Sequence, residues 1–195
     1  MSNRVLQGFI LVCLVWASGQ SPLAQDNFHE NNRRWDRWGP QIERWLTIED
    51  AILQEVNDLR AARGLSRLRP HPLLSEIARR HSHDMIERNY FDHITPELHS
   101  PDERVRHRMG DVISDLAENL WMRLGALPYE SPEETAQTIV ANWLSSPGHR
   151  DNLLEPHFTH LGVGFYGSDD GLHLRATQLF AFMSGAIEAV AFPQP

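Results

Sequence analysis

WLSSPGHRDNLLEPHFTHLGVGF, residues 143–165, is the stretch that decides the fold of this chain. Trp143 belongs to a helix that we expect to stop at Pro147-Gly148, because proline fixes φ and glycine tolerates the conformations that follow a helix. His149 would then stand on the corner just beyond the helix. Further along, Gly162-Val163-Gly164 begins a predicted strand, and its two glycines would let another element approach the backbone closely. The stretch therefore places an ionisable ring where a helix end meets a sheet.

The pattern on either side of this stretch predicts helices first and a small sheet later. Apolar residues at helical spacing follow the capping residues Thr47, Ser100 and Ser131, or Pro72 in a first turn. Helices are expected over residues 47–63, 72–89 and 100–110 and from 131 onward, and strands over 116–122, 161–166 and 172–182. The last two strands would form an antiparallel hairpin through residues 167–171. This order favours an α+β or layered α-β-α domain over repeated βαβ units.

The composition excludes a general nucleic-acid binder. The chain is 41% hydrophobic and 23% charged, as a globular protein is, and its formal net charge is −8. A nucleic-acid binder would show a basic stripe. The nearest feature is four arginines between Arg60 and Arg69, which we interpret as a solvated helix end.

The N-terminus has the pattern of an export signal. Arg4 precedes the apolar run from Gly8 to Ala17, and small residues follow it. We therefore predict a signal peptide over residues 1–24, cleaved near 19–24, and a secreted or periplasmic protein. The alternative is a retained membrane anchor, although the apolar run is shorter than the about 20 residues that a membrane span needs. The chain's one cysteine, Cys13, lies in this apolar run, so the exported protein would hold no disulfide. Once the signal is removed, the protein would also not be transmembrane.

The rest of the chain divides into an extension, a domain and a tail. Residues 25–46 form a polar extension that contains Trp35, Trp38 and Trp45. We interpret it as a linker whose tryptophans pack on the domain surface, and the alternative is an aromatic patch for a ligand or a cell-wall glycan. The domain is predicted over residues 47–184, followed by a tail over 185–195.

Three residues are candidates for metal binding or catalysis: His93 after an aromatic turn, Glu118 inside an apolar run, and His149. A carboxylate in an apolar strand must be paired, metal-bound or protonated, because burying it alone is costly. Two imidazoles and a carboxylate suit a zinc-like cation with open positions, or general acid-base catalysis. Spacing alone does not show that they meet. We interpret His81 as a core histidine and His83 as solvated.

Several ordered motifs resemble the bacterial CAP/SCP domain, whose superfamily includes cysteine-rich secretory proteins, venom antigen 5 and plant pathogenesis-related class 1 proteins. The first is His81-Ser82-His83-Asp84-Met85 followed by Tyr90-Phe91-Asp92-His93. The second is Ala117-Glu118-Asn119-Leu120. The third runs from Trp143 through His149-Arg150 to Gly162-Val163-Gly164. The resemblance covers about residues 48–182.

The resemblance implies an α-β-α sandwich with a cleft lined by two histidines and two acids. The histidines would be His93 and His149, which would also be the metal ligands, and the first acid would be Glu118. The position of the second acid holds Ser146. Glu97 or Glu155 are candidates to replace that acid in space. Asn119 and Ser146 complete the candidate ligand-binding residues, and any divalent cation would bind weakly.

Two function classes follow from these observations. The first is an extracellular binding or interaction module for a metal and a small lipid or peptide ligand, the ligand classes that the resemblance implies. The second is a peptidase-like hydrolase, in which His93 or His149 acts with Glu118 on water or on Ser146. The serine lacks the strand-turn-helix G-x-S-x-G setting of a nucleophile elbow. We therefore place the binding module first.

Overall fold

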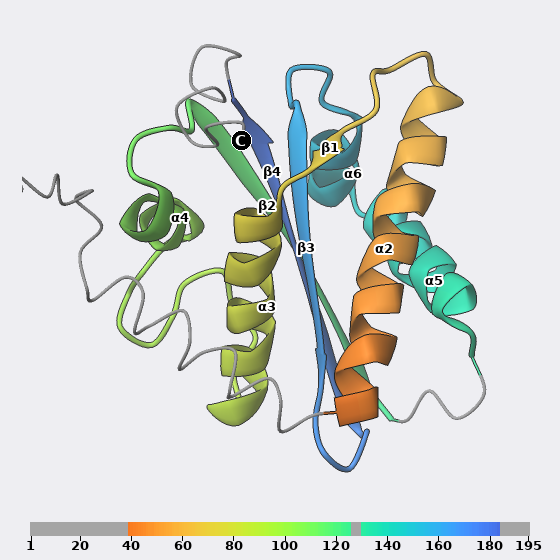
Figure 1. Cartoon of the computed structure of the whole chain (residues 1–195), viewed down its shortest axis with the longest axis vertical. Helices are drawn as coiled ribbons and strands as arrows, with labels where there is room; N and C mark the ends of the chain where they lie inside the picture. Colours follow the sequence, from red (N-terminus) through yellow and green to blue (C-terminus); the bar gives the residue numbers. More distant parts are fainter. Residues whose placement is uncertain (1–38, 126–129, 184–195) are drawn as a thin grey trace, which may run out of the picture. The chain divides into compact units, whose positions relative to one another are not determined.

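A four-stranded sheet forms the centre of the described structure, with its strands in the order β1-β3-β4-β2 (Figure 1). The computed structural model describes residues 39–125 and 130–183. The predicted signal peptide, Trp35, Trp38 and the tail over 185–195 lie outside these residues. The strands are β1 Arg69–Pro70, β2 Asp115–Leu124, β3 His160–Gly167 and β4 His173–Phe182. The helices are α2 Gly39–Ala61, α3 Pro72–Glu87, α4 Pro101–Met109, α5 Pro132–Ser145 and α6 Pro147–Leu154.

The predicted α-β-α sandwich is confirmed. Strands β2, β4 and β3 pair antiparallel, and α3 and α4 lie on one side of the sheet with α2, α5 and α6 on the other (Figure 1). Strand β1 pairs parallel with β3. The sequence did not predict β1, because two residues are too few to show a period. None of the described helices is long and apolar enough to span a membrane.

The two glycines of β3 allow α3 to lie directly on the sheet, as predicted. A Cβ atom built on Gly164 would stand 1.9 Å from the backbone nitrogen of Arg79, and one on Gly162 would stand 2.4 Å from Leu74. Side chains opposite one another in neighbouring strands share a face of the sheet. The α3 face therefore carries three cross-strand rows: Glu118–Leu179–Gly162, Leu120–Thr177–Gly164 and Met122–Arg175–Tyr166.

The outer edge of β3 is closed by side chains. The backbone N–H of Phe165 donates to Glu49 Oε1 at 2.9 Å, and that of Val163 donates to Ser75 Oγ at 3.2 Å. Glu49 also accepts from Arg79 Nε at 2.8 Å. Burial raises the pKa of Glu49, whereas the hydrogen bond and charge of Arg79 act against that rise. This buried ion pair links α2, α3 and β3.

The first helix begins earlier than predicted. It starts at Gly39, and Thr47 does not cap it, because the Thr47 hydroxyl donates to the carbonyl of Glu43 inside the helix at 2.8 Å. Trp45 is 3% exposed, and its ring centroid lies 4.5 Å from that of Tyr166. Trp45 therefore belongs to the core and not to a surface linker.

Arg60 is not part of a solvated helix end, contrary to the prediction. Its side chain is fully buried and donates to the carbonyls of Ser66, Leu153 and Glu155, each at 2.9 Å. Arg60 thus ties α2 to the end of α6. The arginine count could not show this, because a single guanidinium that binds backbone carbonyls leaves no periodic signal.

The junction between α5 and α6 also differs from the prediction. Pro147 begins α6 and does not end α5, which stops at Ser145. Proline is well suited to the first turn of a helix, where its missing N–H leaves no bond unmade. His149 therefore lies in the first turn of α6 and not beyond a helix. The predicted capping residues Ser100 and Ser131 are confirmed, and each forms a capping box with the glutamate three residues later.

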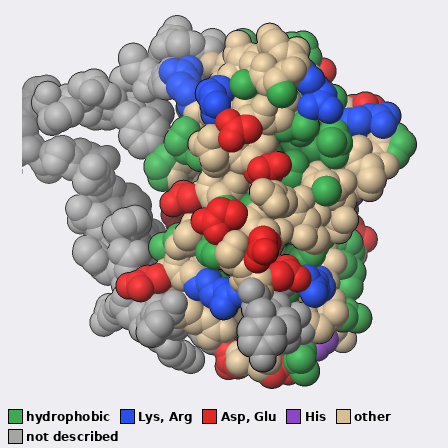
Figure 2. Space-filling model, turned by 90° about the vertical axis from the view of Figure 1, so that its right-hand side faces the viewer, with side chains coloured by type: hydrophobic (Ala, Val, Ile, Leu, Met, Phe, Trp, Pro, Cys, Tyr) green, Lys and Arg blue, Asp and Glu red, His purple; other side chains and the backbone are tan. Residues whose placement is uncertain are grey.

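Figure 2 shows the side of the molecule that lies to the right in Figure 1, where acidic side chains lie along the middle of the face. Exposed acidic residues of α2 include Glu43, Asp50 and Asp58. Asp58 pairs with the neighbouring Arg67 at 2.7 Å. Basic side chains lie on this face in small separate groups and do not form the stripe that a polyanion would require.

Candidate functional site

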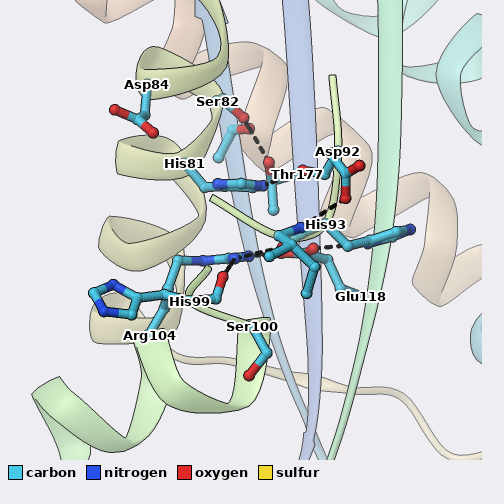
Figure 3. A network of polar contacts seen from close by, with 12 residues as sticks. His81, Ser82, Asp84, Asp92, His93, His99, Ser100, Arg104, Glu118 and Thr177 are labelled. Atoms are coloured by element: carbon cyan, nitrogen blue, oxygen red, sulfur yellow. Dashed lines mark hydrogen bonds and ion pairs between the residues drawn. The ribbon is translucent and has the colours of Figure 1, made fainter. Parts of the chain in front are cut away.

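Glu118 is the centre of a polar network between β2, α4 and the loop that follows α3. Its side chain is 2% exposed, and its two oxygens have different partners. Oε1 lies 2.8 Å from His93 Nδ1, and Oε2 accepts a hydrogen bond from Arg104 Nη2. Figure 3 shows Arg104 and His93 approaching the carboxylate from opposite sides. Of the three predicted site residues, the structure thus brings His93 and Glu118 into direct contact.

Arg104 also fixes the loop that carries His93. Its Nη1 donates to the carbonyl of His93 at 2.7 Å and to the carbonyl of His99 at 3.3 Å. Its side chain is only 12% exposed. Upstream, α3 ends where Asn89 adopts a left-handed φ of 52°, a conformation that asparagine tolerates at helix C-termini. The backbone N–H of Ile94 then donates to Asp92 Oδ1 at 2.8 Å, which closes the turn around His93.

The contact with Glu118 orients the ring of His93. Because Nδ1 faces the carboxylate, the opposite nitrogen, Nε2, is the one left for other partners. The His93 side chain is 48% exposed. The hydrogen bond to Glu118 raises the pKa of His93, although partial burial opposes that rise. The arrangement presents one imidazole nitrogen to solvent in a fixed orientation.

His81 lies in the same network but is a core histidine, as predicted. It is 2% exposed, and its Nε2 lies 3.0 Å from the carbonyl of Asp92. Burial lowers the pKa of His81 to about 4, so the ring is neutral near pH 7. His83 was predicted to be solvated, and this prediction is wrong. Its side chain is only 14% exposed, and its ring packs edge-on against Tyr166.

His149 lies close enough to His93 for their charges to interact. Partial burial is the main cause that lowers the pKa of His149, and the charge of His93 is the second. The first turn of α6 is held to the sheet through Asn119, whose Nδ2 donates to the carbonyl of His149 at 3.2 Å. Asn152 in turn donates to Asn119 Oδ1 at 2.9 Å. This network of amides therefore fixes the backbone that carries the second imidazole.

The other predicted site residues have different roles. Asn119 is fully buried and its amide is bonded within the protein, so its side chain does not line a ligand surface. Ser146 lies between α5 and α6, and its hydroxyl makes no capping hydrogen bond. Glu97 does not replace the missing acid, because it pairs with Arg88. Glu155 accepts from the backbone of His157 at 3.0 Å, and its carbonyl binds Arg60.

The donor atoms around Glu118 do not fit a closed metal cage. Both carboxylate oxygens already have partners, and one partner is the permanent cation of Arg104. Within residues 39–125 and 130–183 there is no group of three or more His, Cys, Asp or Glu side chains arranged to hold a metal ion. Of the predicted ligands, only the imidazoles of His93 and His149 remain without such a competing cation in contact.

Sequence reasoning missed Arg104. It lies in α4, a short helix that is recognisable from its capping box but carries three arginines and one histidine. Nothing in their spacing singles out the one that turns toward β2. The sequence did indicate that Glu118 needs a cationic partner, because it is a carboxylate in an apolar strand. The sequence did not show which cation would supply it.

Comparisons with known proteins agree with this architecture. The family model described as CAP, cysteine-rich secretory protein family, matches residues 53–182. The uncharacterised protein YkwD of Bacillus subtilis is 37% identical over 120 residues, which cover 62% of this chain and 43% of that protein. The uncharacterised membrane protein YlbC of the same species is 35% identical over 126 residues, which cover 63% of this chain and 34% of that protein. The chain thus spans less than half the length of these relatives.

Solved structures show the same fold. An extracellular protein containing an SCP domain from Bacillus anthracis is 30% identical, with a TM-score of 0.56, over 69% of this chain and 40% of that chain. An outer surface protein from Borrelia burgdorferi is 18% identical, with a TM-score of 0.60, over 70% of this chain and 93% of that chain. The second likeness concerns the fold alone.

Proposed function

This chain belongs to the CAP, or cysteine-rich secretory protein, family, and we propose that it is an extracellular binding module. The site of this module is the ring of His93, held by Glu118, together with the nearby His149. Its ligand is a small lipid or peptide, and any divalent cation binds weakly beside it. The extracellular location rests on the predicted signal peptide and on the extracellular B. anthracis relative.

The observation that carries the proposal is the double engagement of Glu118. A general base needs an oxygen that can accept a proton from water. Both oxygens of Glu118 already accept from Arg104 and His93, and the side chain is 2% exposed. The carboxylate therefore serves to orient His93. Nε2 of that ring is left to donate to, or accept from, a ligand according to pH.

One observation favours the hydrolase as the second candidate. A histidine whose Nδ1 is held by a carboxylate is the arrangement that lets Nε2 act as a general base. The same contact joins His93 and Glu118 at 2.8 Å. However, no serine, threonine or cysteine among the described residues hydrogen-bonds to His93. A hydrolase here would have to activate water directly, which makes it the second choice.

Parallel binding and turnover assays distinguish the two candidates. A panel of fluorescent peptides and fatty acids is titrated against the wild type, His93→Gln and His107→Gln, which changes an exposed histidine of α4. The same peptides and fatty-acid esters are tested for hydrolysis. We expect binding that His93→Gln weakens and His107→Gln does not, without turnover. Turnover that His93→Gln abolishes would replace the binding module by the hydrolase, and binding unaffected by His93→Gln would refute the site.

The extracellular location has a separate test. We predict that export removes roughly the first 19–24 residues, where Arg4, the apolar run and the small residues form a signal pattern. N-terminal sequencing of the protein from its native host measures the cleavage point. A mature chain that begins at Met1 would contradict the prediction and would leave the binding assay as the only support for the module.

A further inference from the structure

Arg175 is a buried cation with no acidic partner among the residues that the structure describes. It is 4% exposed and lies on β4, at the centre of the row Met122–Arg175–Tyr166. Its Nη1 donates to the carbonyl of Leu174 at 3.0 Å. Its Nε is buried without an acceptor. Burial lowers the pKa of Arg175, and no carboxylate within residues 39–125 and 130–183 acts against this.

Among the described residues, the other largely buried arginines have more partners than Arg175, although Nη2 of Arg60 and Nε of Arg104 are also buried without an acceptor. Arg79 pairs with Glu49, and Arg104 pairs with Glu118. Arg60 donates to three backbone carbonyls. Burying a charge without such partners is costly, and a fold keeps it only where something else compensates the cost. Arg175 therefore has fewer compensating contacts than the arginines that hold the fold together, since its one hydrogen bond within the described part of the chain is to the carbonyl of the preceding residue.

The surroundings of Arg175 are apolar and partly open. The ring of Phe91 lies over the guanidinium, with its centroid 5.6 Å from Cζ. Such a cation–π contact offsets only part of the burial cost. Phe91 is 41% exposed, and Met122, beside Arg175 on β2, is 37% exposed. The cation thus lies beneath apolar side chains that themselves reach solvent.

We propose that Arg175 anchors a second binding site, which takes a carboxylate that carries an apolar group. The Nε–H and Nη2 groups form one edge of the guanidinium, and that edge matches the two oxygens of a carboxylate. The apolar group would lie against Met122 and Phe91. To admit the carboxylate, Phe91 moves aside from the guanidinium. The site is separate from the His93–Glu118 network, and the proposal does not rest on the proposed function.

Matched probes test the chemistry and distinguish two sources of such a ligand. Hexanoate represents a fatty acid, and hexylammonium is its control with the same chain and the opposite charge. N-acetyl-leucine represents a peptide C-terminus, and N-acetyl-leucinamide is its neutral control. The full chain is titrated while the Nε–H resonance of Arg175 is followed by NMR. We expect one or both carboxylates to shift that resonance and the two controls to leave it unchanged.

Three variants assign the binding to Arg175. Arg175→Met should weaken the carboxylate by about tenfold or more, the loss of a charge-assisted hydrogen bond. Arg175→Lys keeps the charge without the two-donor edge and should weaken it less. Arg123→Met is the control, because Arg123 lies on the other face of β2 and pairs with Glu130 at 2.8 Å. Thermal unfolding of each variant shows whether it is folded.

The outcomes decide the proposal in both directions. Carboxylate binding that Arg175→Met removes and Arg123→Met keeps would support it, and the tighter probe would identify the source. A wild type that binds neither carboxylate at millimolar concentration would overturn it. Equal binding of hexanoate and hexylammonium would also overturn it, because the apolar surface alone would then be the site. If Arg175→Met does not fold, Arg175→Lys carries the test, and unchanged affinity in that variant would refute the two-donor edge.

Discussion

Two buried acid–arginine pairs lie in the part of the chain that the structure describes, and they differ in what else the carboxylate binds. Glu49 and Arg79 are 7% and 13% exposed, and Glu118 and Arg104 are 2% and 12% exposed. Besides its arginine, Glu49 binds a backbone N–H of β3, whereas Glu118 binds the half-exposed ring of His93. The first pair is therefore closed within the structure. The Glu118–Arg104 pair also holds the ring of His93, which faces solvent. For this reason the second pair is a candidate site and the first is not.

The comparison predicts unequal losses when each arginine is replaced. Arg79→Met should lower the free energy of unfolding by about 3–5 kcal/mol, because it leaves Glu49 buried and uncompensated. Arg104→Met should cost less, about 1–3 kcal/mol, because His93 still donates to Glu118. Urea denaturation at pH 7 measures both losses.

The pH dependence sharpens this prediction. The pKa of His93 is raised in the folded state. Its protonated form therefore stabilises the fold fully below the unfolded pKa of about 6.5, and this stabilisation is lost as the pH rises through the folded pKa. The cost of Arg104→Met should accordingly be larger at pH 8 than at pH 6. A cost that is equal to that of Arg79→Met at both pH values would contradict the distinction between the two pairs.

The two histidines near Glu118 have opposite pKa shifts and predict opposite pH effects. Burial lowers the pKa of His81 to about 4. The unfolded chain then binds the proton more tightly, so stability is present above the unfolded pKa of about 6.5 and falls between that value and 4. The loss from His81 alone is roughly 3 kcal/mol.

Thermal unfolding between pH 7 and pH 4 tests the role of His81. Carboxylates also titrate in this range, so the difference between two slopes is the relevant quantity. His81→Gln should show a shallower decline than the wild type, and the exposed control His107→Gln should not. Identical slopes for all three proteins would show that the acid sensitivity arises elsewhere.

The sequence predicted the parts of the site that local patterns encode and missed those that packing decides. Glu118 was recognisable because a carboxylate interrupted an apolar strand, and Gly162 and Gly164 because strands seldom hold two glycines. The position of His93 in a loop could be predicted from the end of the preceding helix, α3, alone. Arg104 and Arg175 were not recognisable, because the partners of a long side chain depend on which elements lie beside it in space. The start of α2 was missed for a related reason, since Trp45 belongs to the core through tertiary contacts such as the one with Tyr166.

The smallest expected effect concerns metal binding at His93, on the solvent-facing side of the Glu118–Arg104 pair. Zinc requires neutral imidazole, so protons compete with it near a pKa of about 6.5. We expect the wild type to bind zinc weakly at pH 7.5 and not measurably at pH 5.5. Arg104→Gln should bind about tenfold more tightly, because it removes a cation and releases an oxygen of Glu118.

Calorimetric titration measures these affinities, and a double variant locates the site. The chain has 11 histidines, so surface residues alone could produce a weak signal. His93→Ala/His149→Ala should abolish the binding, and equal binding by this variant would assign the zinc to other histidines. If Arg104→Gln binds no better than the wild type, the cation does not approach Glu118, and that carboxylate acts only to orient His93. If Arg104→Gln gains affinity and loses it again on adding Glu118→Gln, the guanidinium is what keeps a metal from the carboxylate in this chain.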